Sequence, residues 1–117
     1  MVILMKIAFT AYGNSWREQV DIRFGRAKGF FVVDTETNET TWMDNKKNVA
    51  AAQGAGTSAA QAVVEAGVRE LITGKVGPKA GAVLKAGGVR VLGGIGYTSI
   101  EEAYQRYKKG MLREQKL

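Results

Sequence analysis

The first half of the chain shows the alternation of apolar and polar residues that is typical of β-strands. Lys6 to Tyr12 (KIAFTAY) alternates in this way and ends at the turn signal Gly13-Asn14. Gly29 to Asp34 (GFFVVD) is rich in residues that favour strands. Thr40 to Asp44 (TTWMD) follows it after the turn-like tetrapeptide Thr35 to Asn38. These patterns predict a first strand and then a hairpin.

The second half of the chain changes to helices that alternate with strands. The expected elements are a helix over Thr57–Ala66, a strand over Val68–Thr73, a helix from Pro78 to Gly87-Gly88, a strand over Val89–Leu92 and a helix that ends near Lys109. The preceding segment, Asn45–Gly56, is rich in small and polar residues, which predicts a loop.

Sequence signals also mark where these helices begin. Ser58 and Gln61 have capping-box spacing at the start of the first helix. Pro78 stands where a helix favours proline, at its first residue. For the third helix two capping pairs stay open, Thr98 with Glu101 and Ser99 with Glu102.

An internal repeat indicates how the strands are connected. The stretch from Ala62 (AVVEAGVRELITGKVG) resembles the stretch from Ala82 (AVLKAGGVRVLGGIG). Both contain a helix end, a glycine stop, a strand and a glycine loop. Two consecutive helix–strand units place their strands parallel, with right-handed crossovers. Together with the antiparallel hairpin they predict an α/β fold, a mixed sheet of five strands covered by helices.

Length and composition favour one domain over residues 1–117. Hydrophobic residues make up 45% of the 117 residues, enough to form a core. The apolar run Met1–Met5 is too short for a signal sequence, and no stretch approaches the roughly 18 apolar residues of a membrane span. We therefore expect a cytoplasmic protein with no membrane partner.

The chain is basic, with a formal net charge of +6. Much of the excess lies towards the C-terminus, at Arg106, Lys108, Lys109, Arg113 and Lys116. We expect residues 111–117 to form a flexible basic tail. An excess of basic over acidic residues is found both in ordinary lysine-rich surfaces and in proteins that bind nucleic acid or acidic ligands.

The residue types present exclude several kinds of chemistry. The chain has no histidine and no cysteine, so it holds no disulfide, zinc–thiolate site or cysteine-bound iron–sulfur cluster. Without histidine it has no Ser-His-Asp or Cys-His arrangement. The first strand carries no carboxylate, which a two-metal nuclease of the ribonuclease H type needs. We therefore expect a protein that is not an enzyme.

Three glycine-rich stretches stand before the expected helices: Gly54 to Ala60 (GAGTSAA), Gly74 to Ala80 (GKVGPKA) and Gly93 to Ser99 (GGIGYTS). They place three helix N-termini at one edge of the sheet, where backbone N–H groups can hold an anion. The alternative is that the glycines only permit tight turns. The candidate ligand-binding residues in these stretches are Gly54, Gly56, Thr57, Gly74, Gly77 and Gly94.

Basic residues precede the second strand and would lie near the same edge. Arg23, Arg26 and Lys28 come just before a strand that runs antiparallel to the first, so its start lies beside the end of the first strand. Arginine offers a fixed set of donors to carboxylates and phosphates. The alternative is a solvated basic loop.

Three stretches together cover much of the chain: FGRAKGFFVVD from Phe24, the repeat region from Gly54 to Gly94 and TSIEEAYQRYKKGML from Thr98. With them, the chain from Lys6 to about Leu112 resembles the dinitrogenase iron–molybdenum cofactor biosynthesis family. The resemblance implies a three-layer, ribonuclease H-like fold with strand order 3-2-1-4-5 and strand 2 antiparallel. It adds Phe24 and Gly25, in the Phe-Gly-Arg-Ala element, to the candidate cofactor-binding residues.

The same resemblance implies a small accessory protein that carries or helps to assemble a metallocluster. Its ligand would be an iron–sulfur or iron–molybdenum type cluster, and its partners would be cluster-assembly or acceptor proteins. Members often have a histidine directly before Phe-Gly-Arg-Ala, whereas this chain has Arg23. Arginines could instead hold an anionic cluster, or another small anion, by charge. Two alternative functions stay open, nucleic-acid binding and regulatory protein interaction on the same fold.

Overall fold

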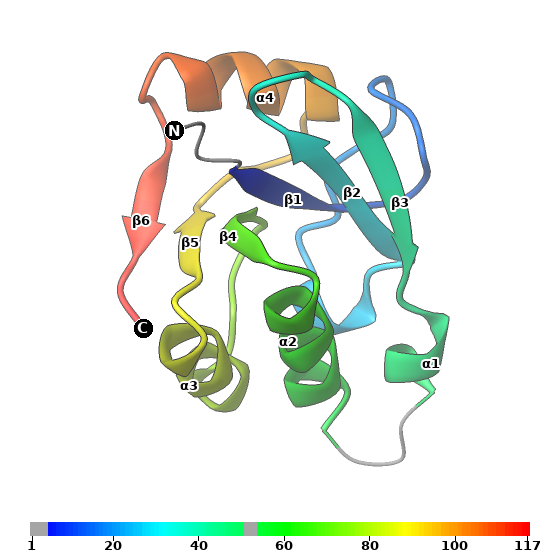
Figure 1. Cartoon of the computed structure of the whole chain (residues 1–117), viewed down its shortest axis with the longest axis vertical. Helices are drawn as coiled ribbons and strands as arrows, with labels where there is room; N and C mark the ends of the chain where they lie inside the picture. Colours follow the sequence, from blue (N-terminus) through cyan, green and yellow to red (C-terminus); the bar gives the residue numbers. More distant parts are fainter. Residues whose placement is uncertain (1–4, 51–53) are drawn as a thin grey trace.

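A mixed six-stranded sheet lies at the centre of the molecule, in a computed structural model that describes residues 5–50 and 54–117 (Figure 1). The strand order is β3-β2-β1-β4-β5-β6. Strand β1 pairs antiparallel with β2 and parallel with β4, and the β4–β5 pair is also parallel. The strands are β1 (Lys6–Ala11), β2 (Gly29–Asp34), β3 (Thr40–Asp44), β4 (Val68–Ile72), β5 (Arg90–Gly93) and β6 (Arg113–Gln115).

Helices cover both faces of this sheet. Helices α2 and α3 lie on one face and α4 lies on the opposite face, which gives three layers (Figure 1). The helical segments are η1 (Phe24–Arg26), α1 (Lys46–Val49), α2 (Ala55–Glu65), α3 (Pro78–Ala86) and α4 (Ile100–Lys108). Within the described residues, none of these helices has the length and apolar character needed to cross a membrane.

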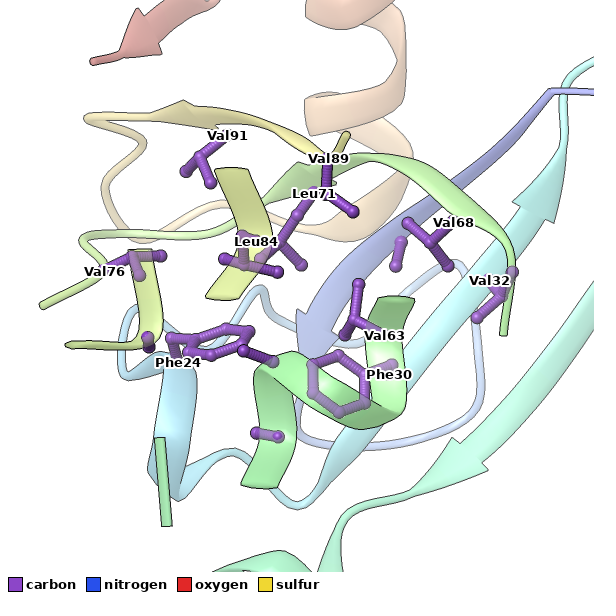
Figure 2. Packing of buried hydrophobic residues seen from close by; sticks show 14 residues of the cluster. Phe24, Phe30, Val32, Val63, Val68, Leu71, Val76, Leu84, Val89 and Val91 are labelled. Atoms are coloured by element: carbon purple, nitrogen blue, oxygen red, sulfur yellow. The ribbon is translucent and has the colours of Figure 1, made fainter. Parts of the chain in front are cut away.

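The two faces of the sheet carry two separate hydrophobic clusters, because successive strand residues point to opposite faces. In β1, Ala8 belongs to the cluster under α2 and α3, whereas Ile7 and Phe9 belong to the cluster under α4. Figure 2 shows the first cluster, in which Val63 of α2 and Leu84 of α3 point towards the sheet. Both of these side chains are fully buried.

The predicted α/β architecture is confirmed, including strand order 3-2-1-4-5 and the antiparallel second strand. The C-terminal segment differs from the prediction. Arg113–Gln115, expected within a flexible tail, forms a sixth strand that pairs antiparallel with β5. The polar residues of this strand give no hydrophobic signal. Its pairing satisfies backbone groups along the edge of β5, and Leu117, just after the strand, packs against the hydrophobic cluster under α3.

The structure confirms one predicted helix cap and contradicts another. Helix α2 begins at Ala55, and its N-cap is Gly54 in the left-handed conformation, with φ of 73°. The Ser58–Gln61 capping box is therefore wrong, since the Ser58 N–H already donates to the Gly54 carbonyl. Of the two pairs proposed for α4, Ser99 with Glu102 is confirmed.

The loop expected over residues 45–56 is only partly irregular. Its residues 46–49 form the short helix α1, with Asn45 as the preceding residue. The Asn45 side chain is buried and donates to the Ala27 carbonyl at 2.9 Å, which ties this segment to the end of η1. Residues 51–53 of the expected loop, like residues 1–4 of the apolar N-terminal run, lie outside the described part.

Candidate functional site

The N-termini of α2 and α3 come together beside the carboxyl end of β4. Helix α2 runs into β4 and α3 follows it, so both helices begin at the same edge of the sheet. The two helices pack directly on one another there: a Cβ placed on Gly56 would lie 3.5 Å from the Cβ of Ala80. The sequence correctly placed these two helix starts at one edge.

The short helix η1 closes the third side of this region. A Cβ added to Gly25 would lie only 3.0 Å from the Gly56 Cα and 3.1 Å from its nitrogen. Any larger residue at 25 would push η1 away from the first turn of α2. The absence of a side chain at both positions lets two backbone segments meet and leaves space beside them.

An open cavity of about 410 Å³ lies between these three elements. Six of the residues predicted from the sequence line it, as do four others. The lining residues are Phe24, Gly25, Gly54, Gly56, Thr57, Lys75, Gly77, Pro78, Lys79 and Ala80. We call this cavity the α2/α3 cavity.

At the starts of α2 and α3, which both line this cavity, no backbone acceptor is found for the first N–H groups within the described residues. The first N–H groups of a helix have no acceptor within the helix. Within the described residues, neither helix has a side-chain N-cap, and both N-caps are glycines, Gly54 and Gly77. Each helix end also carries a partial positive charge.

Two lysines that the sequence reasoning missed add full charges. Lys75 and Lys79 line the cavity and are solvent-exposed, and no acidic residue is among the lining residues. Both lie within the second glycine-rich stretch, GKVGPKA, so a reading of that stretch for charge as well as glycine would have found them. The cavity therefore combines amide donors with two cationic side chains.

The third predicted helix start does not contribute to this site. Helix α4 lies on the other face of the sheet, and its first N–H groups are already occupied. Ile100 N donates to the Glu18 carbonyl and Glu101 N to the Trp16 carbonyl, both at 2.9 Å. Glu102 N donates to the Ser99 hydroxyl at 3.1 Å. The expectation of three free helix N-termini at one edge is therefore wrong for α4.

Two of the predicted glycines do not line the cavity: Gly74 permits a close backbone contact, and Gly94 adopts a positive φ. A Cβ on Gly74 would lie 2.4 Å from the Ile22 carbonyl oxygen, so this position accepts only glycine without a shift of the backbone. Gly94 has φ of 71° and donates its N–H to the Gly74 carbonyl at 3.0 Å. Both glycines hold the loop after β4 against its neighbours.

Arg23 also lies beside the cavity without lining it. Its guanidinium donates to both carboxylate oxygens of the buried Asp21 at 3.0 Å and lies 5.8 Å from the centre of the Tyr12 ring. The hydrogen bond and the negative charge of Asp21 raise the pKa of Arg23 above its ordinary value. Arg23 is thus engaged in holding the loop that precedes η1.

The other two predicted cations are placed differently. Arg26 and Lys28 are exposed, and neither forms an ion pair within residues 5–50 and 54–117. Neither is a lining residue, although Arg26 directly follows Gly25, which is one. Their charges remain available to a ligand or partner.

The donor set suits an anion and does not suit a bare metal ion. The chain has no histidine or cysteine, and no three acidic residues group together in the part that the structure describes. The lining is largely apolar, and the lysine ammonium groups and backbone N–H groups among its residues are the donors that it offers. Such groups bind oxygen or sulfur atoms that carry negative charge.

Comparisons with known proteins relate the chain to solved structures of the same fold. The apo form of the orange protein from Desulfovibrio gigas is 37% identical, with a TM-score of 0.92 over 98% of this chain and 96% of that chain. A Thermotoga protein described as a candidate NifB protein is 33% identical, with a TM-score of 0.81 over 94% of this chain and 92% of that one.

Sequence comparisons cover almost the whole chain. An uncharacterised protein from Methanocaldococcus jannaschii is 32% identical over 115 residues, which is 97% of this chain and 93% of that protein. The model of the family described as "dinitrogenase iron-molybdenum cofactor" matches residues 5–110. The resemblance seen in the sequence is thereby confirmed, and the chain belongs to the dinitrogenase iron–molybdenum cofactor family.

Proposed function

We propose that this protein is a non-enzymatic carrier that holds an anionic metallocluster in the α2/α3 cavity. The observation that carries the proposal is the convergence of two helix N-termini and two lysines on one cavity. The cluster would be of the iron–sulfur or iron–molybdenum type, in keeping with the family. The protein would bind and release it without chemical turnover.

The binding mode follows from the residues that are absent from the chain. Protein-bound iron clusters usually take cysteine thiolates, with histidine as a common second ligand, and this chain has neither. A cluster in the cavity would therefore keep its own sulfide and small-molecule ligands. The protein would contact those outer atoms through N–H groups and lysine ammonium groups. Phe24, Pro78 and Ala80 would exclude water from its remaining surface.

This mode suits a carrier, because no metal–protein bond has to be broken on release. A partner that offers thiolate or imidazole ligands could take the cluster directly. Such a partner would be a cluster-assembly or acceptor protein. The structure of a similar protein, the orange protein, is described as an apo form, which supports a removable ligand in this fold.

The proposal is tested by anaerobic titration with a synthetic thiolate-capped iron–sulfur cluster and with isolated iron–molybdenum cofactor. We expect saturable binding that weakens as salt rises, since charge provides much of the attraction. Lys75→Ala, at a lining residue of the cavity, should weaken binding about ten-fold, equivalent to about 1.4 kcal/mol.

Lys109→Ala is the matched control, because it removes one exposed positive charge at the end of α4, on the opposite face of the sheet. It should leave the affinity unchanged. Absence of saturable cluster binding by the wild type would overturn the carrier proposal. Equal affinities of the two variants would show that Lys75 contributes only to the general charge.

A further inference from the structure

The side chain of Gln115, in the C-terminal strand β6, pairs with the backbone of Val76. Its amide nitrogen donates to the Val76 carbonyl at 2.7 Å, and its amide oxygen accepts from the Val76 N–H at 3.0 Å. The two hydrogen bonds imitate a step of a β-ladder, with a side chain in place of a neighbouring strand. Val76 lies in the loop between β4 and α3, so Gln115 links the end of the chain to that loop.

This loop forms one wall of the α2/α3 cavity. Lys75 and Gly77, on either side of Val76, both line the cavity, and α3 begins one residue later. The Val76 side chain is buried in the core, with 3% exposure. The loop is held at its start by the Gly94 N–H bond to Gly74 and in its middle by Gln115.

The strand that carries Gln115 is itself anchored on both faces of the sheet. Leu117 packs against the cluster under α3, and a Cβ on Gly81 would lie 3.2 Å from its side chain. Glu114 pairs with Arg90 at 2.9 Å, and Arg90 also bonds Glu70, which accepts a hydrogen bond from Tyr107 of α4. Gln115 therefore acts from a fixed support and not from a loose tail.

We propose that Gln115 is a positioning residue for the ligand site: it fixes the loop at Val76 so that Lys75 and the start of α3 face the cavity. The inference rests on the proposed function and adds the contact that preorganises the site. A loop that is already ordered loses less conformational freedom on binding, which favours affinity. Loss of the two hydrogen bonds should free this wall of the cavity without dismantling the sheet.

Gln115→Met tests the inference, because methionine is close to glutamine in size and length but cannot form either hydrogen bond. Glu114→Gln is the matched control: it lies in the same strand and loses the charge pair with Arg90, yet leaves the Gln115–Val76 contact intact. If the substitutions act only by weakening β6, both variants should be affected alike. If the position of the loop is what matters, only Gln115→Met should be affected.

Two measurements are made on each protein. Amide hydrogen exchange of the ligand-free protein reports on the loop, and we expect the Val76 amide to exchange about ten-fold faster in Gln115→Met. Affinity for the synthetic thiolate-capped iron–sulfur cluster should fall about five-fold in that variant. Glu114→Gln should leave both values at those of the wild type.

The outcomes separate this inference from the carrier proposal. If the wild type binds the cluster and Gln115→Met binds it equally well, or if the loop exchanges at the wild-type rate, the inference is overturned and the carrier proposal stands. If the wild type does not bind the cluster, both are overturned. Should Gln115→Met fail to fold, Gln115→Leu replaces it, since leucine also lacks both hydrogen-bonding groups and adds no charge, and the same criteria apply.

Discussion

The N-termini of α2, α3 and α4 all follow glycine-rich sequence, but they differ in what lies against them. The chain itself covers the N-terminus of α4, whereas the N-termini of α2 and α3 border a cavity. Each helix follows a glycine-rich stretch near the carboxyl edge of the sheet. At α4, the chain itself occupies the first N–H groups, through Ser99, Glu18 and Trp16. At α2 and α3, no side-chain N-cap is found within the described residues, and residues of both first turns line a cavity with two lysines. Glycine content alone therefore does not identify a binding site.

The difference comes from the segment that covers each helix start. The segment over α4 is anchored by Trp16, whose ring contacts the rings of Phe31 and Tyr104 at 4.9 Å and 5.1 Å between centres. The segment over α2 is η1, which also has an aromatic anchor, since Phe24 packs against Phe30 at 5.9 Å between ring centres. The difference is that Trp16 and Glu18 offer backbone carbonyls to the first N–H groups of α4, whereas η1 offers none to α2 within the described residues.

The largest expected effect is on ligand binding after charge reversal in the cavity. Lys75→Glu with Lys79→Glu should weaken binding of the synthetic iron–sulfur cluster at least about a hundred-fold, or about 2.8 kcal/mol, because two attractions become repulsions. The control is Lys108→Glu with Lys109→Glu, at the end of α4, which changes the net charge equally. Isothermal titration calorimetry under anaerobic conditions measures both.

If both double variants lost affinity to the same extent, the ligand would respond to overall charge and not to the cavity. The contrast between the two helix layers would then have no functional meaning. A large loss at the cavity alone, with the control near wild type, would place the ligand beside α2 and α3.

The fold could be predicted from local patterns, whereas the state of each helix end could not. The hairpin, the helix–strand repeat and the glycine stops each leave a signal within a few residues, and they suffice to predict a mixed sheet of five strands. The strand order 3-2-1-4-5 was implied by the family resemblance. The groups that occupy the start of α4 come from Trp16 and Glu18, far away in the sequence. No pattern around Ser99 reveals them.

Parts of the site were equally hidden from the sequence. The cavity exists because Gly25 and Gly56 meet, a contact between two distant segments. The pairing of Gln115 with Val76 depends on a polar strand that has no hydrophobic period. Arg23 looked like a free cation because its partner Asp21 could not be known to be buried.

A smaller effect is expected on stability when the cap of α4 is removed. Ser99→Ala deletes the acceptor of the Glu102 N–H and should lower the free energy of unfolding by about 1 kcal/mol. Ser58→Ala is the control, since Ser58 lies inside α2 and does not cap it; its effect should be close to zero. Urea denaturation measures both, and cluster affinity should be unchanged in each. A stability loss at Ser58 equal to that at Ser99 would contradict the assigned helix starts.

The smallest effect is expected at alkaline pH, and it tests whether the α4 face is purely structural. Burial, together with the hydrogen bond to Glu70, raises the pKa of Tyr107 above its ordinary value. The unfolded chain therefore releases the Tyr107 hydroxyl proton at about pH 10, while the folded chain retains it. Folding stability must then fall as the pH rises above that point. Tyr107→Phe lacks this proton, so its stability should fall less steeply than that of the wild type in urea denaturation between about pH 10 and pH 11. The difference should be modest because Tyr107 is only partly buried and solvent screens it.

Tyr97→Phe, at a side chain that is 82% exposed, should keep the wild-type slope. Parallel curves for all three proteins would show that the Tyr107 proton is not linked to folding. A loss of cluster affinity in Tyr107→Phe at neutral pH would show instead that the closed α4 face takes part in binding.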